Sequence, residues 1–146
     1  MMKTKKISTI VLLILVFSAT GLKAQEPDPA RTNQSSDSLV ILWTSDDPML
    51  AERMVLMYTH AAKTAGWFEH VTLIIWGPSA KLTAENMKIR EKLTAMQNDG
   101  VVIEACVACA NAYGVTEELK ALGFDVKGMG KPLTDYLKSG KKVMTF

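Results

Sequence analysis

Two hydrophobic periods alternate along this chain from about residue 38 onward. Five short apolar runs predict β-strands: Leu39–Thr44, Val71–Trp76, Val101–Ala105, Phe124–Val126 and Val143–Phe146. Between them, apolar residues recur at helical spacing, and five stretches predict helices: Leu50–Ala65, Leu82–Met96, Val107–Tyr113, Glu117–Leu122 and Leu133–Ser139. Strands that alternate with helices favour a flavodoxin-like α/β/α sandwich with about five mostly parallel strands covered on both faces.

Glycine and methionine positions add detail to this pattern. Five glycines directly follow predicted helices, where a left-handed C-cap is favoured: Gly66, Gly100, Gly114, Gly123 and Gly140. Three methionines fall on the predicted apolar helix faces, and we expect them to fill the core: Met54, Met57 and Met96.

Residues 1–24 are typical of a secretory signal peptide. Lys3, Lys5 and Lys6 precede the apolar run Ile10–Phe17, which is too short to span a bilayer, and Ala24 supplies a small residue for cleavage. An uncleaved N-terminal anchor is the alternative. Residues 25–37 contain no Val, Ile, Leu, Met or aromatic residue and are predicted to form a flexible linker, which leaves residues 38–146 as the folded domain. We therefore expect a periplasmic or secreted protein with no membrane association after signal removal.

The net charge argues against nucleic-acid binding. Four of the 17 basic residues lie before Gln25, which leaves 13 basic against 15 acidic residues in the remainder, a formal charge of −2. A phosphate backbone requires a basic surplus, which this chain lacks. Two cysteines are also too few for a disulfide scaffold, although an exported chain could keep one disulfide.

Open parallel sheets build their sites at the carboxyl ends of the strands, where several loops meet. The first strand leads into Thr44–Pro48, in which Asp47 and Pro48 suit a helix N-cap and first turn. An acidic or metal site is the alternative there. The two carboxylates and the proline disfavour a phosphate cradle, and the fragment Gly128-Met-Gly130 is too short to indicate a dinucleotide. We expect no bound cofactor.

The third strand leads into Cys106 and Cys109, the only cysteines of the chain. If a helix begins near Val107, Cys106 lies at its N-terminus, where exposed N–H groups favour a thiolate and water can reach the sulfur. Cys109 would lie one turn later on a similar face, close enough for a disulfide. The alternative is that both are small buried packing residues. A zinc site is not expected, because His60 and His70 cannot readily converge with the cysteines.

The segment Cys106-Val-Ala-Cys-Ala-Asn-Ala-Tyr-Gly114-Val115 resembles the active-cysteine segment of the DsrE-like sulfur-relay family. The similarity runs from about Leu39 to Phe146 and includes Gly130-Lys-Pro-Leu-Thr-Asp-Tyr-Leu. The resemblance implies a three-layer α/β/α fold, trimers or hexamers, and a persulfide carried at Cys106. Cys109 stands where the relay proteins have a small residue, so the persulfide could be resolved as an intramolecular disulfide.

Three functional hypotheses follow. The first is an exported DsrE-like sulfur carrier, or a sulfurtransferase-like protein, with Cys106 as the persulfide acceptor. The second is an exported thiol–disulfide protein that uses Cys106 and Cys109. The third is a non-enzymatic oligomeric binding module with structural cysteines. The expected partners are further copies of the chain, in a homotrimer or homohexamer, and a sulfur-donor or sulfur-acceptor protein.

Overall fold

A computed structural model describes residues 37–146 and contains one five-stranded, fully parallel sheet in the order β4-β3-β2-β1-β5. The strands are β1 (Ser38–Trp43), β2 (His70–Ile75), β3 (Val102–Cys106), β4 (Asp125–Lys127) and β5 (Lys142–Thr145). The predicted signal peptide and residues 25–36 of the predicted linker lie outside the described residues. The predicted α/β/α sandwich with a parallel sheet is thus confirmed.

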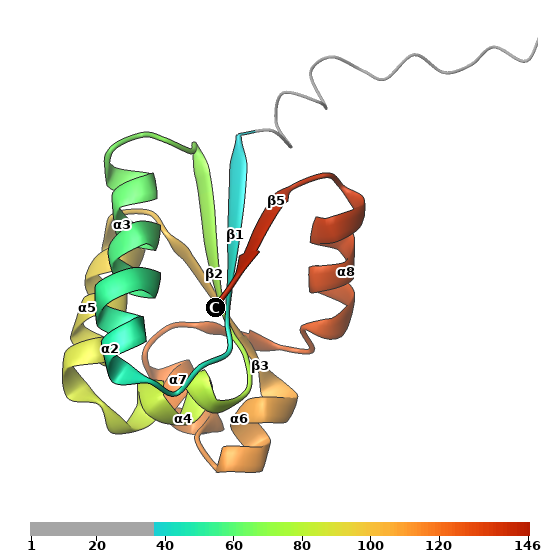
Figure 1. The fold of residues 1–146 in the computed structure, drawn as a ribbon. Coiled ribbons are helices and arrows are strands. Elements are labelled where there is room, and N and C mark those ends of the chain that lie inside the picture. The colour runs from blue at the N-terminus through green and yellow to red at the C-terminus, as the bar shows by residue number, and fades with distance from the viewer. Residues whose placement is uncertain (1–36) are drawn as a thin grey trace, which may run out of the picture.

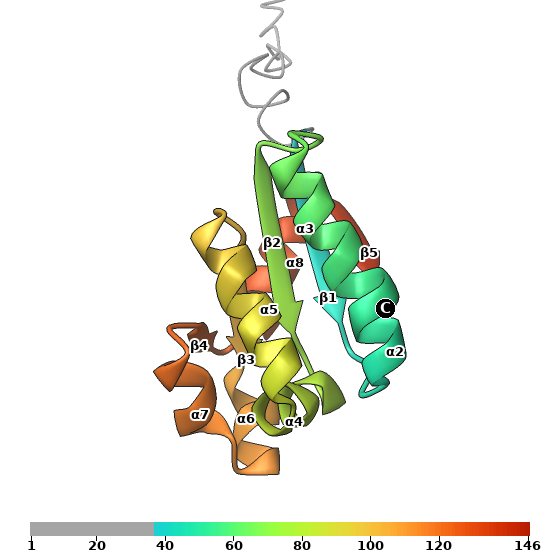
Figure 2. The same ribbon diagram turned by 90° about the vertical axis from the view of Figure 1, so that its left-hand side faces the viewer.

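Helices cover the two faces of the sheet unequally. They are α2 (Pro48–Leu50), the π-helical turn η1 (Ala51–Val55), α3 (Leu56–Thr64), α4 (Pro78–Glu85), α5 (Met87–Asn98), α6 (Val107–Tyr113), α7 (Thr116–Ala121) and α8 (Gly130–Lys138). The continuous helix α2–η1–α3 and helix α5 lie on one face, whereas α8 lies on the other (Figures 1 and 2). Helices α4, α6 and α7 gather at the end of the domain where the strands point.

The strand order explains why α8 has a face to itself. The chain steps from β1 to β2, β3 and β4 in one direction, and then returns from β4 to the far side of β1 to form β5. Connections between parallel strands are right-handed, so reversing the direction places the connecting helix on the opposite face. Helix α8 therefore crosses the sheet from one edge to the other.

The main core lies under α2–η1–α3 and α5. It contains alternate residues of the strands, among them Ile41, Leu73 and Ile103, which pack against Leu93 and Met96 of α5. The face under α8 has a smaller apolar cluster in which Val40, Ile74, Cys106 and Met129 are buried. No residue of α8 itself is buried, so this helix is held less tightly than those opposite.

Two details of the helices differ from the sequence prediction. The predicted Leu82–Met96 helix is part of two helices, because Asn86 is extended and its side chain accepts a hydrogen bond from the Ile89 amide (3.1 Å) to cap α5. Met96 is buried as predicted, but Met54 and Met57 are exposed, so that prediction is wrong for them.

On the buried face of α2–η1–α3, the positions that the hydrophobic spacing predicts for these methionines are taken instead by the small residue Ala51 and the polar residue Thr59. The π-helical turn changes the helical spacing between them, and the Thr59 hydroxyl donates to the Val55 carbonyl oxygen (2.6 Å), so its burial leaves no unpaired group.

Candidate functional site

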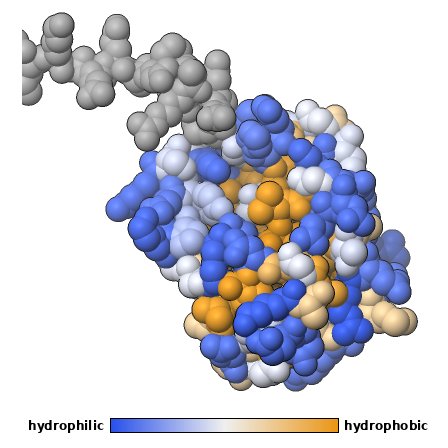
Figure 3. Space-filling model, turned by 180° about the vertical axis from the view of Figure 1, so that it is seen from behind, coloured by the Kyte–Doolittle hydropathy of each residue, from blue (hydrophilic) through white to orange (hydrophobic). Residues whose placement is uncertain are grey.

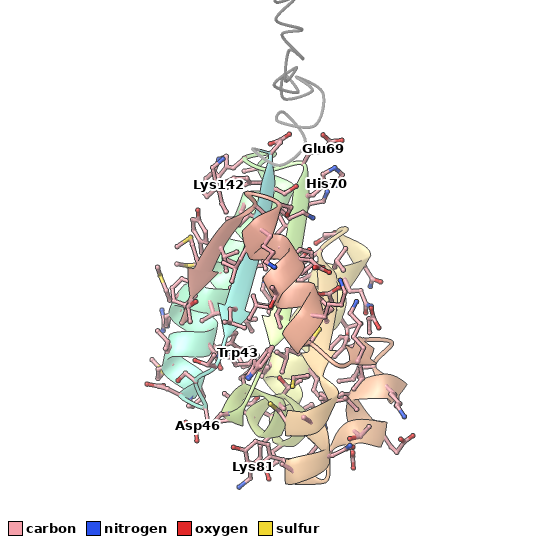
Figure 4. The ribbon with its side chains drawn as sticks, turned by 90° about the vertical axis from the view of Figure 1, so that its right-hand side faces the viewer. Trp43, Asp46, Glu69, His70, Lys81 and Lys142 are labelled. Atoms are coloured by element: carbon pink, nitrogen blue, oxygen red, sulfur yellow. The ribbon has the colours of Figure 1, made fainter. Side chains whose placement is uncertain are left out.

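The loop after β1 is a helix cap. An Asp47 carboxylate oxygen accepts hydrogen bonds from the amides of Met49 (2.8 Å) and Leu50 (3.2 Å), and Pro48 begins α2. The predicted cap is therefore confirmed, and it uses the carboxylate that an acidic site would need. Figure 4 shows the neighbouring Asp46 at the outer end of the domain, on the same side as Lys81.

The buried Ser79 hydroxyl ties together the ends of β1 and β2. It donates to the Trp43 carbonyl oxygen (2.7 Å) and accepts from the Trp76 amide (3.0 Å). Between Trp76 and α4, Gly77 has a φ of 69°, a left-handed conformation that favours glycine. The resulting turn places the Gly77 amide within hydrogen-bonding reach of the Cys109 thiol.

Cys106 ends β3 and is the N-cap residue of α6, where the sequence predicted it. Its side chain is nevertheless buried, at 4% exposure, and makes no capping hydrogen bond, so the expectation of a water-accessible sulfur facing the helix N–H groups is wrong. The reason is the alternation of the strand. Cys106 points to the same face as Glu104, into the cluster with Val40, Ile74 and Met129 under α8.

Cys109, one turn into α6, is half-buried and packs at the margin of the same cluster. Both cysteines are free thiols, and the two side chains are within hydrogen-bonding reach of each other. Burial raises the pKa of the Cys109 thiol, as does the contact with Cys106, whereas the Gly77 amide opposes this shift. The structure therefore brings the two predicted residues together, with Cys109 more exposed and biased toward its neutral form.

A buried polar cluster beside Cys106 was not predicted from the sequence. The Glu104 side chain is 5% exposed, and its Oε1 accepts hydrogen bonds from Lys127 Nζ (2.7 Å) and Tyr136 Oη (2.9 Å). Lys127 also pairs with Asp125 (2.5 Å), and its backbone lies in register with Cys106 on the neighbouring strand. The other Glu104 oxygen, Oε2, is buried with no hydrogen-bond partner among the described residues.

This cluster joins β3, β4 and α8, and its contacts shift two pKa values. Burial and the hydrogen bond to Glu104 raise the pKa of Tyr136 to about 12. Hydrogen bonds to Asp125 and Glu104 raise the pKa of Lys127 above its usual range. Both groups therefore remain hydrogen-bond donors across the physiological pH range. The one sign of this cluster in the sequence is Glu104 itself, a charged residue within an apolar strand. Its partners Lys127 and Tyr136 lie 23 and 32 residues further along the chain, and no local pattern connects them to it.

Neither histidine lies beside the cysteines. His60 is on α3, on the face opposite α8, where its Nε2 lies 2.6 Å from an Asp99 carboxylate oxygen and its Nδ1 lies 2.7 Å from Lys92 Nζ. His70 begins β2 at the other end of the domain, near Glu69 and Lys142 (Figure 4). Within residues 37–146, no three or more His, Cys, Asp or Glu side chains are grouped to hold a metal ion. No helix in this part of the chain has the length and apolar character needed to cross a membrane.

Comparison with known proteins supplies a family. The model of the DsrE/DsrF-like family matches residues 37–146. A solved structure of BT1422 from Bacteroides thetaiotaomicron, described as a conserved protein of unknown function, has 37% sequence identity and a TM-score of 0.76, over 82% of this chain and 100% of that one. The ychN protein of E. coli shares the fold at 15% identity, with a TM-score of 0.60 over 76% and 99% of the two chains. No match was found among curated protein sequences.

Proposed function

Because the chain belongs to the DsrE/DsrF-like family, which is associated with sulfur relay, we propose that it carries sulfur as a persulfide on Cys106. The observation that supports this assignment is the placement of two free thiols within hydrogen-bonding reach at the carboxyl end of β3. Apolar side chains pack around Cys106, among them Ile74, Trp76 and Met129, and the Glu104–Lys127–Tyr136 cluster lies beside it. A persulfide held there is shielded from water and from the thiols of other molecules.

The transfer needs no cofactor. The Cys106 thiolate attacks the outer sulfur of a donor persulfide, R–S–SH; a new S–S bond forms at Cys106, the donor's S–S bond breaks, and R–S⁻ leaves with the electron pair. The proton lost from Cys106 is then available to neutralise R–S⁻. The products are Cys106–S–SH and R–SH, so the carrier undergoes no net oxidation or reduction beyond the transferred sulfur atom.

Cys109 gives the loaded carrier a second reaction. Its thiolate can attack the Cys106 sulfur, release HS⁻ and leave a Cys106–Cys109 disulfide. Because burial raises the pKa of Cys109, this step is slower at neutral pH than it would be with an ordinary thiol. The slower step gives the persulfide more time to be passed to an acceptor protein.

Mass spectrometry after treatment with a small persulfide donor tests the proposal. We expect one added sulfur atom on Cys106, and Cys109→Ser should increase the persulfide that accumulates. Cys106→Ser should remove the persulfide at position 106 and lower total loading, because burial still raises the pKa of the remaining Cys109 thiol. Unmodified thiols in the wild-type chain would contradict the proposal and favour structural cysteines in a binding module.

The contact between the thiols favours a second candidate function, dithiol–disulfide exchange by Cys106 and Cys109. Its mark is a loss of two hydrogen atoms from the chain on treatment with a disulfide oxidant and no persulfide donor, with no HS⁻ released, because HS⁻ release is the mark of a resolved persulfide. A measured reduction potential then decides whether the pair acts as an oxidant. A potential below about −300 mV is typical of a structural disulfide and would argue against this function.

Export and self-association complete the proposal. The charged and apolar segments of residues 1–24 support secretion into the periplasm or medium, with a mature chain that begins near Gln25. N-terminal sequencing of the secreted fraction tests this, and an intact Met1 in the membrane fraction would contradict it.

A homotrimer or homohexamer is supported by the family and by apolar side chains on the surface. Met49, Trp67 and Met87 are each more than half exposed. As a separate observation, Figure 3 shows apolar surface in the middle of one face and toward the end that carries α6. Light scattering at micromolar concentration tests this, and a monomer mass would overturn it.

A further inference from the structure

Cys106 cannot meet a sulfur donor in the structure as it stands. Only 4% of its surface is exposed, and small reagents or a donor persulfide need direct contact with the sulfur atom. Its buried neighbours Val40 and Ile74 belong to the interior strands β1 and β2, which pair over six residues and cannot move without breaking the sheet. The other members of the cluster come from three places: Leu42, Trp76 and Val143 from the strands and their ends, Cys109 from α6, and Met129, Leu133 and Tyr136 from α8 and its N-cap position. The last three are the ones that a movement of α8 would carry away.

Helix α8 is the element that can move at least cost. None of its nine residues is buried, whereas α3 and α5 on the opposite face each bury three: Leu56, Thr59 and Ala62 on α3, and Ile89, Leu93 and Met96 on α5. Glycines flank it at both ends, and glycine has more backbone freedom than other residues. At Gly128 and Gly130 no atom lies within 4 Å of the position that a Cβ would take, so neighbouring groups do not pack against these two residues there.

Within residues 37–146, one side-chain hydrogen bond joins the middle of α8 to the sheet. Tyr136 Oη donates to Glu104 Oε1 (2.9 Å), and Lys127 fixes the same carboxylate from β4 (2.7 Å). The closed arrangement leaves Glu104 Oε2 buried without a donor, which is costly for a carboxylate. Water that enters when α8 moves away would satisfy this oxygen and so offset part of the cost of opening.

We infer that α8 is a gate over Cys106, and that Tyr136 and Glu104 are the positioning residues that set how often it opens. The inference rests on the proposed function for its purpose, because opening admits the sulfur donor and closing protects the persulfide. The gate itself is a property of the fold and is measurable without any sulfur chemistry. We call the Tyr136–Glu104 hydrogen bond the latch. The charged groups around it are Glu104 on β3, Asp125 and Lys127 on β4, and Lys141, which lies over the Tyr136 ring (4.8 Å).

The test is the rate at which iodoacetamide alkylates Cys106 in a Cys109→Ser background, so that one cysteine remains. Tyr136→Phe removes the latch hydroxyl and keeps the ring. Losing a hydrogen bond to a charged acceptor should raise the alkylation rate about tenfold or more at fixed pH. Tyr58→Phe is the matched control, because it removes a hydroxyl from α3 on the opposite face and should change the rate less than about twofold.

Amide hydrogen exchange identifies the element that moves. In Tyr136→Phe, exchange should accelerate in α8 and stay unchanged in β2. An unchanged alkylation rate would overturn the gate, and so would faster alkylation accompanied by equally faster exchange in β2, since that means global unfolding. If Tyr136→Phe fails to fold, Glu104→Gln provides the same test, with a smaller acceleration expected because a neutral acceptor remains.

Sulfur loading is measured separately on the same proteins. A chain that takes up no sulfur but shows the acceleration has the gate without the proposed function. A chain that loads sulfur with no acceleration has the function without the gate.

Discussion

Replacing Lys127 with methionine should destabilise the domain more than the same replacement of an exposed lysine does. Lys127→Met keeps an apolar side chain of similar length but removes the ammonium that pairs with Glu104. Glu104 would then remain buried with Tyr136 as its one side-chain donor among the described residues. Removing one partner of a buried ion pair is strongly destabilising, because the other charge stays buried without compensation.

The magnitude follows from the burial of the two partners. Breaking a fully buried pair costs about 3–5 kcal/mol, but the Lys127 side chain is 36% exposed and water screens part of the interaction. We therefore expect a loss of about 2–3 kcal/mol in the free energy of unfolding. The double variant Glu104→Leu/Lys127→Met removes both charges, and apolar replacement of an ion pair is often neutral. It also leaves the half-buried Tyr136 hydroxyl without its acceptor, so we expect a loss of about 1 kcal/mol, smaller than that of Lys127→Met alone.

Urea denaturation at pH 7 and one fixed protein concentration measures these differences, since self-association would make stability depend on concentration. The folded state raises the pKa of Lys127, so its contribution is complete below the ordinary lysine pKa and is fully present at pH 7.

Lys131→Met is the control, because Lys131 pairs with Asp135 on the exposed side of α8 and should cost at most about 0.5 kcal/mol. Equal losses in the two single variants would refute the reasoning. A double variant as unstable as Lys127→Met would also refute it.

Three further predictions concern the core, the pH dependence and the site loop. Leu93→Ala should cost about 2–5 kcal/mol in urea denaturation, whereas the exposed Leu137→Ala should change stability by less than about 0.5 kcal/mol. The raised pKa of Tyr136, about 12, means that its contribution to stability is complete below about pH 10 and is lost as pH rises toward 12; Tyr136→Phe should flatten that alkaline part of the pH–stability curve. Gly77→Ala and Gly66→Ala both place a side chain at positive φ, and each should lower the free energy of unfolding by about 1 kcal/mol. Only Gly77→Ala should also slow alkylation of Cys109, because it displaces the Gly77 amide that favours the Cys109 thiolate.

The sequence predicted the strands and the location of the cysteines because those features depend on short-range patterns. Alternating and continuous apolar runs identified β1 and β2 to within a residue, and the segment after β3 placed Cys106 at the start of α6. The break at Asn86 was also visible in principle, since asparagine is a common N-cap residue.

The polar contacts of the site depend on long-range packing and could not be read from the sequence. Glu104, Lys127 and Tyr136 meet only because β4 pairs with β3 and α8 crosses the sheet above them. The low exposure of Cys106 has the same origin, because a local pattern cannot show which helix will cover a strand. The outward position of Met54 depends on a π-helical turn, for which the hydrophobic pattern gave no signal.

The return of the chain across the sheet also has a consequence for the order of folding. During synthesis, β1, β2 and β3 emerge first and can already pack against α3 and α5, which cover only the opposite face. Cys106 and Cys109 therefore remain uncovered until residues 130–145 have emerged and β5 has paired with the outer side of β1. A chain that folds in this order has a stage in which the face of the sheet that carries Cys106 lacks its helix, and docking of α8 ends that stage.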